Sequence, residues 1–275
     1  MTVVCEHGIG IGQFQATVYR NYHLQGRSFP WRETSDPYHI LVSEIMLQQT
    51  QTERVIVKYG LFIATFPDFQ TLLEAPIKNI LMVWQGLGYN RRVLNLKSIA
   101  QKVVTEHKGR LPAILEELTA LPGIGQATAG SILAFAFNIP IAFIETNIRR
   151  VFIHFFFADR DMVNDGEILP LVDATLDRRN PRQWYYALMD YGVMLKGAST
   201  NLNRKSAHYQ RQSPFEGSER QVRGRIIKAL ISCREASPMQ LSATLHIDLA
   251  RITSNLLELE REGLLERFGD GYRIP

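Results

Sequence analysis

A short turn with two glycines, Leu121-Pro122-Gly123-Ile124-Gly125, constrains the fold of this chain more than any other segment. The residues before it have helical character up to about Ala120, and a second helical stretch begins near Gln126. The turn is therefore predicted to join two helices in a tight hairpin. Glycines let the backbone approach another group closely, and the N-terminus of the second helix carries a partial positive charge. Such a hairpin can hold a phosphate, although an ordinary helical turn has the same pattern.

Three other segments narrow these alternatives. After the hairpin, Ile144-Glu145-Thr146-Asn147 is predicted to open a further helix with an acidic residue. Before it lie Ser43-Glu44-Ile45-Met46-Leu47-Gln48-Gln49-Thr50-Gln51 and Trp84-Gln85-Gly86-Leu87-Gly88-Tyr89. In this order the motifs resemble those of the helix-hairpin-helix (HhH-GPD) DNA glycosylases. The segment around Glu44 resembles the one that carries the general acid in the adenine glycosylase (MutY-type) branch, and the resemblance extends over roughly residues 20–195.

The resemblance implies an all-α, two-lobed fold with a small C-terminal domain. We expect a six-helix lobe at residues 27–140 that ends in the hairpin, and a second helical lobe built from residues 1–26 and 141–203. A basic linker, residues 204–217, would lead to a domain at residues 218–275. Three helical segments and two short strands joined by a Gly-Asp-Gly turn predict that this last domain resembles a winged helix-turn-helix. Such modules contact DNA or another protein.

Local signals position Glu44 within a helix. Asp36-Pro37 is typical of a helix start, with the aspartate as cap and the proline in the first turn. The helix is predicted to run from Tyr38 to about Gln48, with apolar residues on both sides of Glu44. A solvated helix face is the ordinary place for a glutamate, but a partly desolvated carboxyl holds its proton and can act as an acid.

The resemblance also assigns roles to residues. A glycosylase flips the target base out of the duplex, protonates it as it leaves, and stabilises the cationic sugar with an anion. By the resemblance, Glu44 is the acid, Glu145 is the anion, and the two face each other across a cleft. The base pocket would contain Trp31, Arg32, Leu47, Ala127 and Tyr186. The expected DNA contacts are Gln48, Gln49, Thr50, Tyr89, Gly123, Gly125, Gln126, Thr128 and Asn147, among which Gln48, Gln49 and Tyr89 would wedge into the duplex.

Several positions depart from the family pattern. Glu145 stands where the family has an aspartate, and Ala127 stands where bifunctional relatives have a lysine, so we expect no lyase activity. Tyr186 occupies the position of the Gln or Glu that reads adenine, and the winged-helix-like domain replaces a domain that reads 8-oxoguanine. Adenine opposite 8-oxoguanine or guanine is the leading substrate. Three alternatives remain open. The excised base could be uracil, thymine or hypoxanthine, the enzyme could be a bifunctional glycosylase-lyase, or the protein could bind DNA without catalysis.

Cysteine usage bears on cofactors. Many relatives hold an iron–sulfur cluster through four cysteines that follow a motif resembling Met189-Asp190-Tyr191-Gly192, whereas this chain contains only Cys5 and Cys233. We therefore expect no cluster, no disulfide framework and a reducing compartment. A zinc site made from Cys5, His7, His208 and Cys233 lacks any ligand spacing, so isolated side chains are the preferred interpretation.

Charge and composition fit a DNA-binding protein. The chain of 275 residues has a formal net charge of +4, and residues 204–225 contain six basic and two acidic residues, which suits a strand of phosphates or a solvated linker. No apolar run reaches membrane-spanning length, and the first ten residues lack the pattern of a signal peptide. The expected partner is double-stranded DNA with a mismatch or lesion, bound by a monomer in the cytoplasm at the nucleoid.

Overall fold

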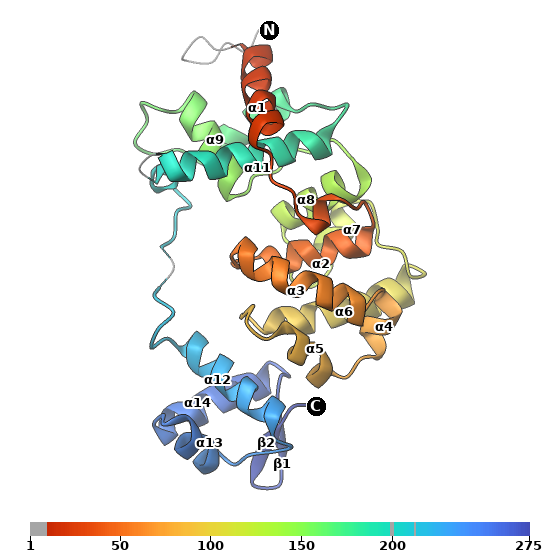
Figure 1. Cartoon of the computed structure of the whole chain (residues 1–275), viewed down its shortest axis with the longest axis vertical. Helices are drawn as coiled ribbons and strands as arrows, with labels where there is room; N and C mark the ends of the chain where they lie inside the picture. The colour runs from red at the N-terminus through yellow and green to blue at the C-terminus, as the bar shows by residue number, and fades with distance from the viewer. Residues whose placement is uncertain (1–9, 199–200, 212) are drawn as a thin grey trace. The chain divides into compact units, whose positions relative to one another are not determined.

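The computed structural model describes residues 10–198, 201–211 and 213–275, and most of them are helical (Figure 1). No helix in these ranges is long and apolar enough to cross a membrane. The described helices are α1 (Ile11–Gln25), α2 (Pro37–Leu47), α3 (Thr52–Thr65), α4 (Phe69–Glu74), α5 (Ile77–Trp84), α6 (Arg91–Glu106), α7 (Leu115–Thr119), α8 (Gln126–Phe137), α9 (Thr146–Phe156), α10 (Asp165–Thr175), α11 (Pro181–Ala198), α12 (Glu219–Ser232), α13 (Pro238–Leu245) and α14 (Leu249–Arg261), with the short 3-10 helices η1 (Pro30–Arg32) and η2 (Leu202–Lys205).

A single antiparallel hairpin near the C-terminus supplies the strands of the described part. It consists of β1 (Glu266–Phe268) and β2 (Gly271–Arg273), with Glu266 opposite Arg273. The predicted all-α class with a small C-terminal sheet is confirmed.

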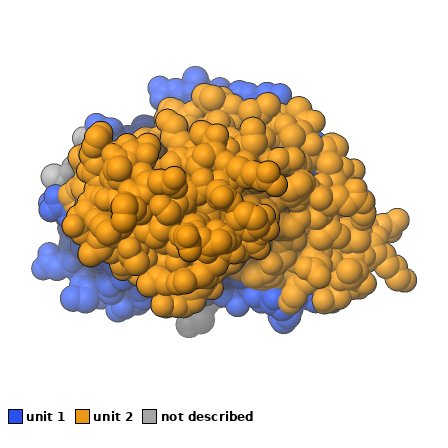
Figure 2. Space-filling view, turned by 90° about the horizontal axis from the view of Figure 1, so that it is seen from below, with its two compact units in different colours: residues 1–40, 113–120, 124–211 blue, residues 41–112, 121–123, 212–275 orange. Residues whose placement is uncertain are grey.

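The chain divides into two compact units, which Figure 2 shows in different colours. Unit 1 comprises residues 1–40, 113–120 and 124–211, and unit 2 comprises residues 41–112, 121–123 and 212–275. This division differs from the expected lobes, because residues 27–40 and 124–140 group with unit 1 and the C-terminal domain groups with residues 41–112. The lobe boundaries expected from the sequence stay a prediction.

Helices α1, α9 and α11 lie together in unit 1 (Figure 1), and aromatic side chains pack between them. Phe14 on α1 meets Phe155 edge-on with ring centroids 5.0 Å apart, and meets Trp184 on α11 at 5.7 Å. Phe14 and Trp184 are completely buried. Edge-to-face pairs of this kind add about 1 kcal/mol each beyond the burial of their area. The N-terminal helix is thereby packed against residues far along the chain.

Unit 2 contains a helical cluster, α3 to α6, and the C-terminal domain. Trp84 packs edge-on against Phe62 with centroids 5.8 Å apart inside the helical cluster. In the C-terminal domain Ser237 caps α13 with a capping box, and Asp248 caps α14. The order of three helices followed by a hairpin is the one predicted for residues 218–275.

The expected linker is partly folded. Val163 N–H donates to the Lys205 carbonyl at 2.8 Å, and Ala207 N–H donates to the Val163 carbonyl at 3.0 Å, so the beginning of the 204–217 segment belongs to unit 1. The basic residues of this region are also partly used within the fold: Arg223 pairs with Glu258 and Glu262, and Arg225 donates to the Leu245 carbonyl. Residues 204–225 therefore do not form a continuous positively charged surface, because several of their basic side chains form ion pairs or hydrogen bonds within the fold.

Candidate active site

The predicted hairpin lies between α7 and α8. Gly123 has a positive φ of 77°, and a Cβ atom there would lie 2.2 Å from Nδ2 of Asn95, so only glycine fits. Gly125 is the N-cap residue of α8 and is exposed, and no side chain caps this helix. Gln126 is exposed at the start of α8, and Thr128 follows in the same turn. An uncapped helix N-terminus at an exposed turn is suited to an anion.

Glu44 is half-buried on α2, between the fully buried Ser43 and Ile45. Asp36 caps this helix as predicted, since its Oδ1 accepts hydrogen bonds from the Tyr38 N–H at 2.8 Å and the His39 N–H at 3.0 Å. The local structure therefore holds the Glu44 side chain at a position that is partly desolvated.

A buried arginine that the sequence analysis did not single out organises the end of α2. Arg92 is 5% exposed, and its Nη1 donates to the carbonyls of Ile45, Met46 and Gln48 at 2.7 to 2.8 Å. Its Nη2 donates to the Leu87 carbonyl, the Gly88 carbonyl and the Thr50 hydroxyl at 2.9 to 3.1 Å. Burial lowers the pKa of Arg92 to about 10, which still leaves it charged at neutral pH. One guanidinium thus joins the loops at 48–50 and 86–89.

The wedge residues predicted from the sequence lie on these two loops. Gln49 (φ 54°) and Tyr89 (φ 47°) both adopt left-handed backbone conformations, which are costly for residues other than glycine and recur at functional sites. Gln49 is exposed, and Gln48 Nε2 donates to the Gly123 carbonyl at 3.2 Å. The Tyr89 hydroxyl accepts a 2.6 Å hydrogen bond from Arg220 at the start of α12.

Glu145 is the N-cap of α9. Its Oε1 accepts from the backbone N–H of Asn147 at 2.7 Å and from that of Ile148 at 2.9 Å, while Oε2 lies 3.3 Å from Nδ2 of Asn147. Burial raises the pKa of Glu145, against the opposing effects of the two N–H groups and of Arg149 and Arg150. The structure therefore gives Glu145 a role in helix capping, and this role leaves the carboxylate in place to act on a ligand as well.

Arg32 is fixed by a buried ion pair. Both of its Nη atoms donate to the Asp190 carboxylate, at 2.8 and 2.9 Å, and Arg27 donates to the same carboxylate at 2.7 Å. Burial by itself would raise the pKa of Asp190, but the hydrogen bonds and charges of Arg32 and Arg27 outweigh it and hold the pKa below its usual value. The Arg32 guanidinium lies 4.5 Å from the centroid of the Tyr186 ring. Phe135 stacks on the same ring with centroids 4.4 Å apart.

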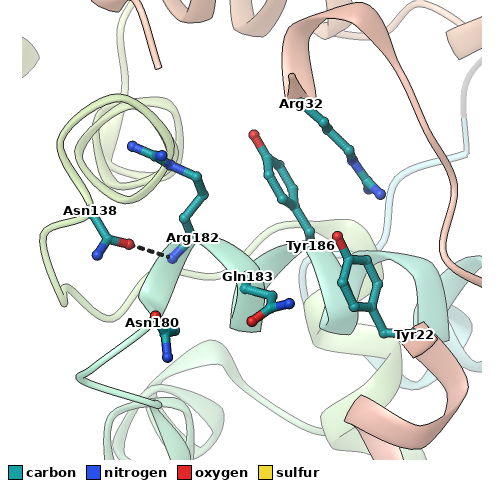
Figure 3. Close-up of a pocket in the computed structure, with 7 residues that line it drawn as sticks. All are labelled: Tyr22, Arg32, Asn138, Asn180, Arg182, Gln183 and Tyr186. Atoms are coloured by element: carbon teal, nitrogen blue, oxygen red, sulfur yellow. Dashed lines mark hydrogen bonds between the residues drawn. The ribbon is translucent and has the colours of Figure 1, made fainter. Parts of the chain in front are cut away.

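Arg32 and Tyr186 line an open pocket of about 340 Å³ in unit 1 (Figure 3). Its other lining residues are Tyr22, Asn138, Asn180, Arg182 and Gln183. Asn138 follows the last residue of α8 and accepts a hydrogen bond from the Arg182 N–H at 3.2 Å, drawn as a dashed line in Figure 3. Two predicted base-pocket residues are thus brought together in a polar pocket.

The other predicted base-pocket residues do not line this cavity. Ala127 lies in the first turn of α8, about 16 Å along the helix from Asn138 at a rise of 1.5 Å per residue. Trp31 is buried and stacks on Phe29 with centroids 5.0 Å apart. Leu47 is half-buried at the end of α2 in unit 2. Glu44 belongs to unit 2 and Glu145 to unit 1, so their facing arrangement stays a prediction.

The zinc site considered from the sequence would use Cys5, His7, His208 and Cys233. No cluster of three or more His, Cys, Asp or Glu side chains able to hold a metal exists in the described ranges. Cys233 directly follows α12, and its Sγ lies 3.2 Å from the Ala229 carbonyl. Cys5 and His7 lie outside the described residues.

Comparison with known proteins identifies the family. The sequence model of the "HhH-GPD superfamily base excision DNA repair protein" family matches residues 42–168. The adenine DNA glycosylase of Mycolicibacterium smegmatis is 30% identical over 269 residues, which cover 91% of this chain and 92% of that protein. The adenine DNA glycosylase of Buchnera aphidicola subsp. Baizongia pistaciae is 37% identical over 187 residues, 66% of this chain and 52% of that protein. The chain spans about half the length of the Buchnera relatives it matches.

A solved structure agrees with this grouping. The structure of a thermostable thymine-DNA glycosylase superposes with a TM-score of 0.63 at 28% identity, covering 67% of this chain and 86% of that one. This chain belongs to the HhH-GPD superfamily of base excision DNA repair proteins, in its adenine glycosylase (MutY-type) branch.

Proposed function

We propose that this protein is a monofunctional DNA glycosylase that removes adenine mispaired with 8-oxoguanine or guanine. The observation that carries this proposal is the similarity to an adenine DNA glycosylase over 91% of the chain. It would act as a monomer on a mismatched or damaged duplex, because one chain contains all the roles that the family motifs assign.

The two glutamates supply the chemistry. Glu44, partly desolvated on α2, would donate a proton to the leaving base, which breaks the N-glycosidic bond with the electron pair moving onto the base. Glu145 would stabilise the cationic sugar until water adds to it. Its capping hydrogen bonds to Asn147 and Ile148 fix the carboxylate before the reaction, so no reorganisation is needed when the charge develops.

DNA binding and base extrusion are assigned to the glycine turn before α8 and to the loops at 48–50 and 86–89. The exposed, uncapped N-terminus of α8 behind Gly123 and Gly125 would hold a backbone phosphate. Gln48, Gln49 and Tyr89 would enter the space that the flipped nucleotide leaves, and Arg92 holds their loops in the required geometry.

Neither a lyase nor a cluster fits the residues present. Ala127 offers no amine for a Schiff base at the hairpin. The segment that follows Gly192 presents Lys, Asn, Ser and His side chains but no thiol, so a four-cysteine cluster does not fit there. We propose that the enzyme works without a cofactor, and elemental analysis for iron tests this.

A second candidate is removal of thymine or uracil. It is favoured by the similarity in structure to a thermostable thymine-DNA glycosylase. The Tyr186 ring stacks on Phe135 and lies against Arg32, and a buried hydroxyl stands where the family resemblance expects the amide or carboxyl that reads adenine. A hydroxyl both donates and accepts hydrogen bonds and is compatible with either base.

A panel of duplexes separates these functions. The protein would be incubated with duplexes that each contain one mispair, and the products would be analysed with and without alkali. The mispairs are adenine opposite 8-oxoguanine or guanine, thymine and uracil opposite guanine, and hypoxanthine opposite thymine. We expect breaks only after alkali, and fastest for the adenine substrates. Glu44→Gln should lose at least a hundredfold in base release while it binds the duplex as before. Equal base release by Glu44→Gln would remove Glu44 from the mechanism, and direct breaks would show a lyase.

A further inference from the structure

A second cavity, of about 480 Å³, lies in unit 1 between α9, the end of α11 and the segment 201–210. Its positively charged or protonatable lining residues are Arg149, Arg150, Lys196 and His208, and no acidic residue lines it. The cavity adjoins the proposed catalytic anion, because Thr146 lines it and the charges of Arg149 and Arg150 act on Glu145, but no DNA contact or step of base release is assigned above to these four side chains.

The positive charge of this cavity is only partly compensated. Arg149 is paired with Asp165 by two hydrogen bonds of 2.6 and 2.7 Å. Arg150 Nη1 donates to Oδ1 of Asn147 and to the Gly192 carbonyl. In the described ranges Lys196 forms no ion pair, and its side chain is exposed at the cavity. Asp165 and Glu145 together offset the charges of Arg149 and Arg150, so the charge that remains for a ligand is that of Lys196.

Among the residues that the structure describes, two deeply buried groups in the cavity wall lack hydrogen-bond partners. Arg150 is 5% exposed and Asn203 is 6% exposed, and Nε of Arg150 and Oδ1 of Asn203 make no hydrogen bond. Leaving such a group unsatisfied costs about 1–3 kcal/mol. A ligand with an anionic oxygen would accept from Arg150. A hydroxyl group on that ligand, or a water molecule bound to it, would donate to Asn203.

The wall of the cavity is fixed before any ligand arrives. The backbone bonds between Val163 and both Lys205 and Ala207 hold the segment 201–210, and the Ser206 hydroxyl accepts from the His208 N–H at 3.1 Å. A preformed group of cations that is partly shielded from water binds anions more strongly than exposed lysines do.

We propose that this cavity is a phosphate-binding site. The chemistry fits a tetrahedral oxyanion, whose several oxygens can accept hydrogen bonds from more than one of the lining side chains, and the volume leaves room for the rest of the molecule. The phosphate belongs either to a DNA backbone or to a small phosphate compound. The inference goes beyond the proposed function, because it concerns binding and needs no base release.

Two variants and a matched control test the site. Asn203→Asp keeps the shape of the side chain and places a carboxylate in the cavity, and Lys196→Gln removes an exposed cation. Arg160→Gln is the control, because it removes a cation of unit 1 that is 47% exposed, pairs with Glu167 and lies outside the cavity. Binding would be measured by calorimetry with inorganic phosphate, and by fluorescence anisotropy with an undamaged duplex at several salt concentrations.

We expect Asn203→Asp to weaken binding at least tenfold and Lys196→Gln several-fold, with the control within twofold of the wild type. If the duplex is the affected ligand, Lys196→Gln should also lower the slope of log K against log salt by about 0.9. If inorganic phosphate alone is affected, the source is a small phosphate compound. The proposal would be overturned if Lys196→Gln bound both ligands as tightly as the wild type does. It would also be overturned if the wild type bound neither ligand saturably. Both outcomes can be read whether or not Asn203→Asp folds.

Discussion

Arg92 donates a 2.7 Å hydrogen bond to the carbonyl of Gln48, although the two residues are 44 positions apart in the sequence. The other terminal nitrogen of Arg92 holds the carbonyls of Leu87 and Gly88. Two loops that carry the proposed wedge residues are therefore positioned by one buried side chain. The planar guanidinium of an arginine has several N–H donors in fixed directions and can bind both loops at once, whereas the ammonium of a lysine is a single compact charge.

We predict that Arg92→Lys lowers base release at least tenfold and lowers the melting temperature by several degrees. The lysine keeps the charge but leaves buried carbonyls without donors, at about 1–3 kcal/mol each. Arg91→Lys is the matched control, because Arg91 is the neighbouring, exposed residue at the start of α6. Stopped-flow or quench measurements with the preferred duplex and thermal melts would be compared. Equal behaviour of the two variants would contradict the positioning role.

The sequence was informative where structure depends on neighbouring residues. Asp36 predicted a helix start correctly, since a cap acts within its own turn. Arg92 was missed because its acceptors are backbone carbonyls of other segments, which no side-chain pattern marks. A clue was available, because an Arg91-Arg92 pair in the first turn opposes the helix dipole and so requires another reason.

The basic region shows a different limit. Composition identified six cations in residues 204–225, but composition cannot tell a free cation from one used within the fold. Arg223 is held by carboxylates of α14, and Arg225 by a carbonyl at the end of α13. The cations that line the cavity in unit 1 come instead from α9, α11 and the segment after it, and the sequence does not place these together.

We predict that Asp190→Asn destabilises the protein by about 3 kcal/mol at neutral pH, since it leaves the buried Arg32 charge without its partner. The pKa of Asp190 is held below its usual value of 3.8, so this carboxylate contributes stability above that pH and loses it as the pH falls through the folded-state value. The variant should therefore show a shallower loss of stability than the wild type below about pH 4.

Urea unfolding at a series of pH values measures both effects. Asp173→Asn is the control, because Asp173 pairs with Arg178 on the surface, where both side chains are more than half exposed. Such a pair contributes about 0–1 kcal/mol. If Asp190→Asn were as stable as this control, the ion pair would not be what holds Arg32 at the pocket.

We predict that Ala127→Lys confers strand nicking on the enzyme. Ala127 lies in the first turn of α8, at the position where bifunctional relatives carry the amine. The amine would attack C1′ of the sugar as the base leaves, and the resulting Schiff base can be trapped with borohydride. Gln126→Lys adds the same charge at the adjacent exposed position and should not form an adduct. Base release without an adduct in Ala127→Lys would mean that α8 approaches the DNA differently.

The pH dependence of base release should reflect Glu145. Its pKa is raised above the usual value of 4.5, chiefly by burial, and only the ionised form can stabilise a cation. The acid limb of the single-turnover rate should therefore lie at a pH above 4.5. A carboxyl with a raised pKa contributes stability below its unfolded pKa and loses it as the pH rises through the folded value. Ionised Glu145 is thus kept at some cost in stability.

Mutants of Glu145 separate its two roles. Glu145→Gln keeps the length of the side chain and an oxygen that can accept from the Asn147 and Ile148 N–H groups, but it loses the charge. We expect a loss of several orders of magnitude in single-turnover base release, disappearance of the acid limb, and a melting temperature within a few degrees of the wild type. Glu145→Asp should retain partial activity, since a shorter carboxylate keeps the charge in a pocket shaped for a longer one. A Glu145→Gln enzyme that melts much lower yet releases base at the normal rate would assign Glu145 to helix capping alone, and the stabilising anion would have to be another residue.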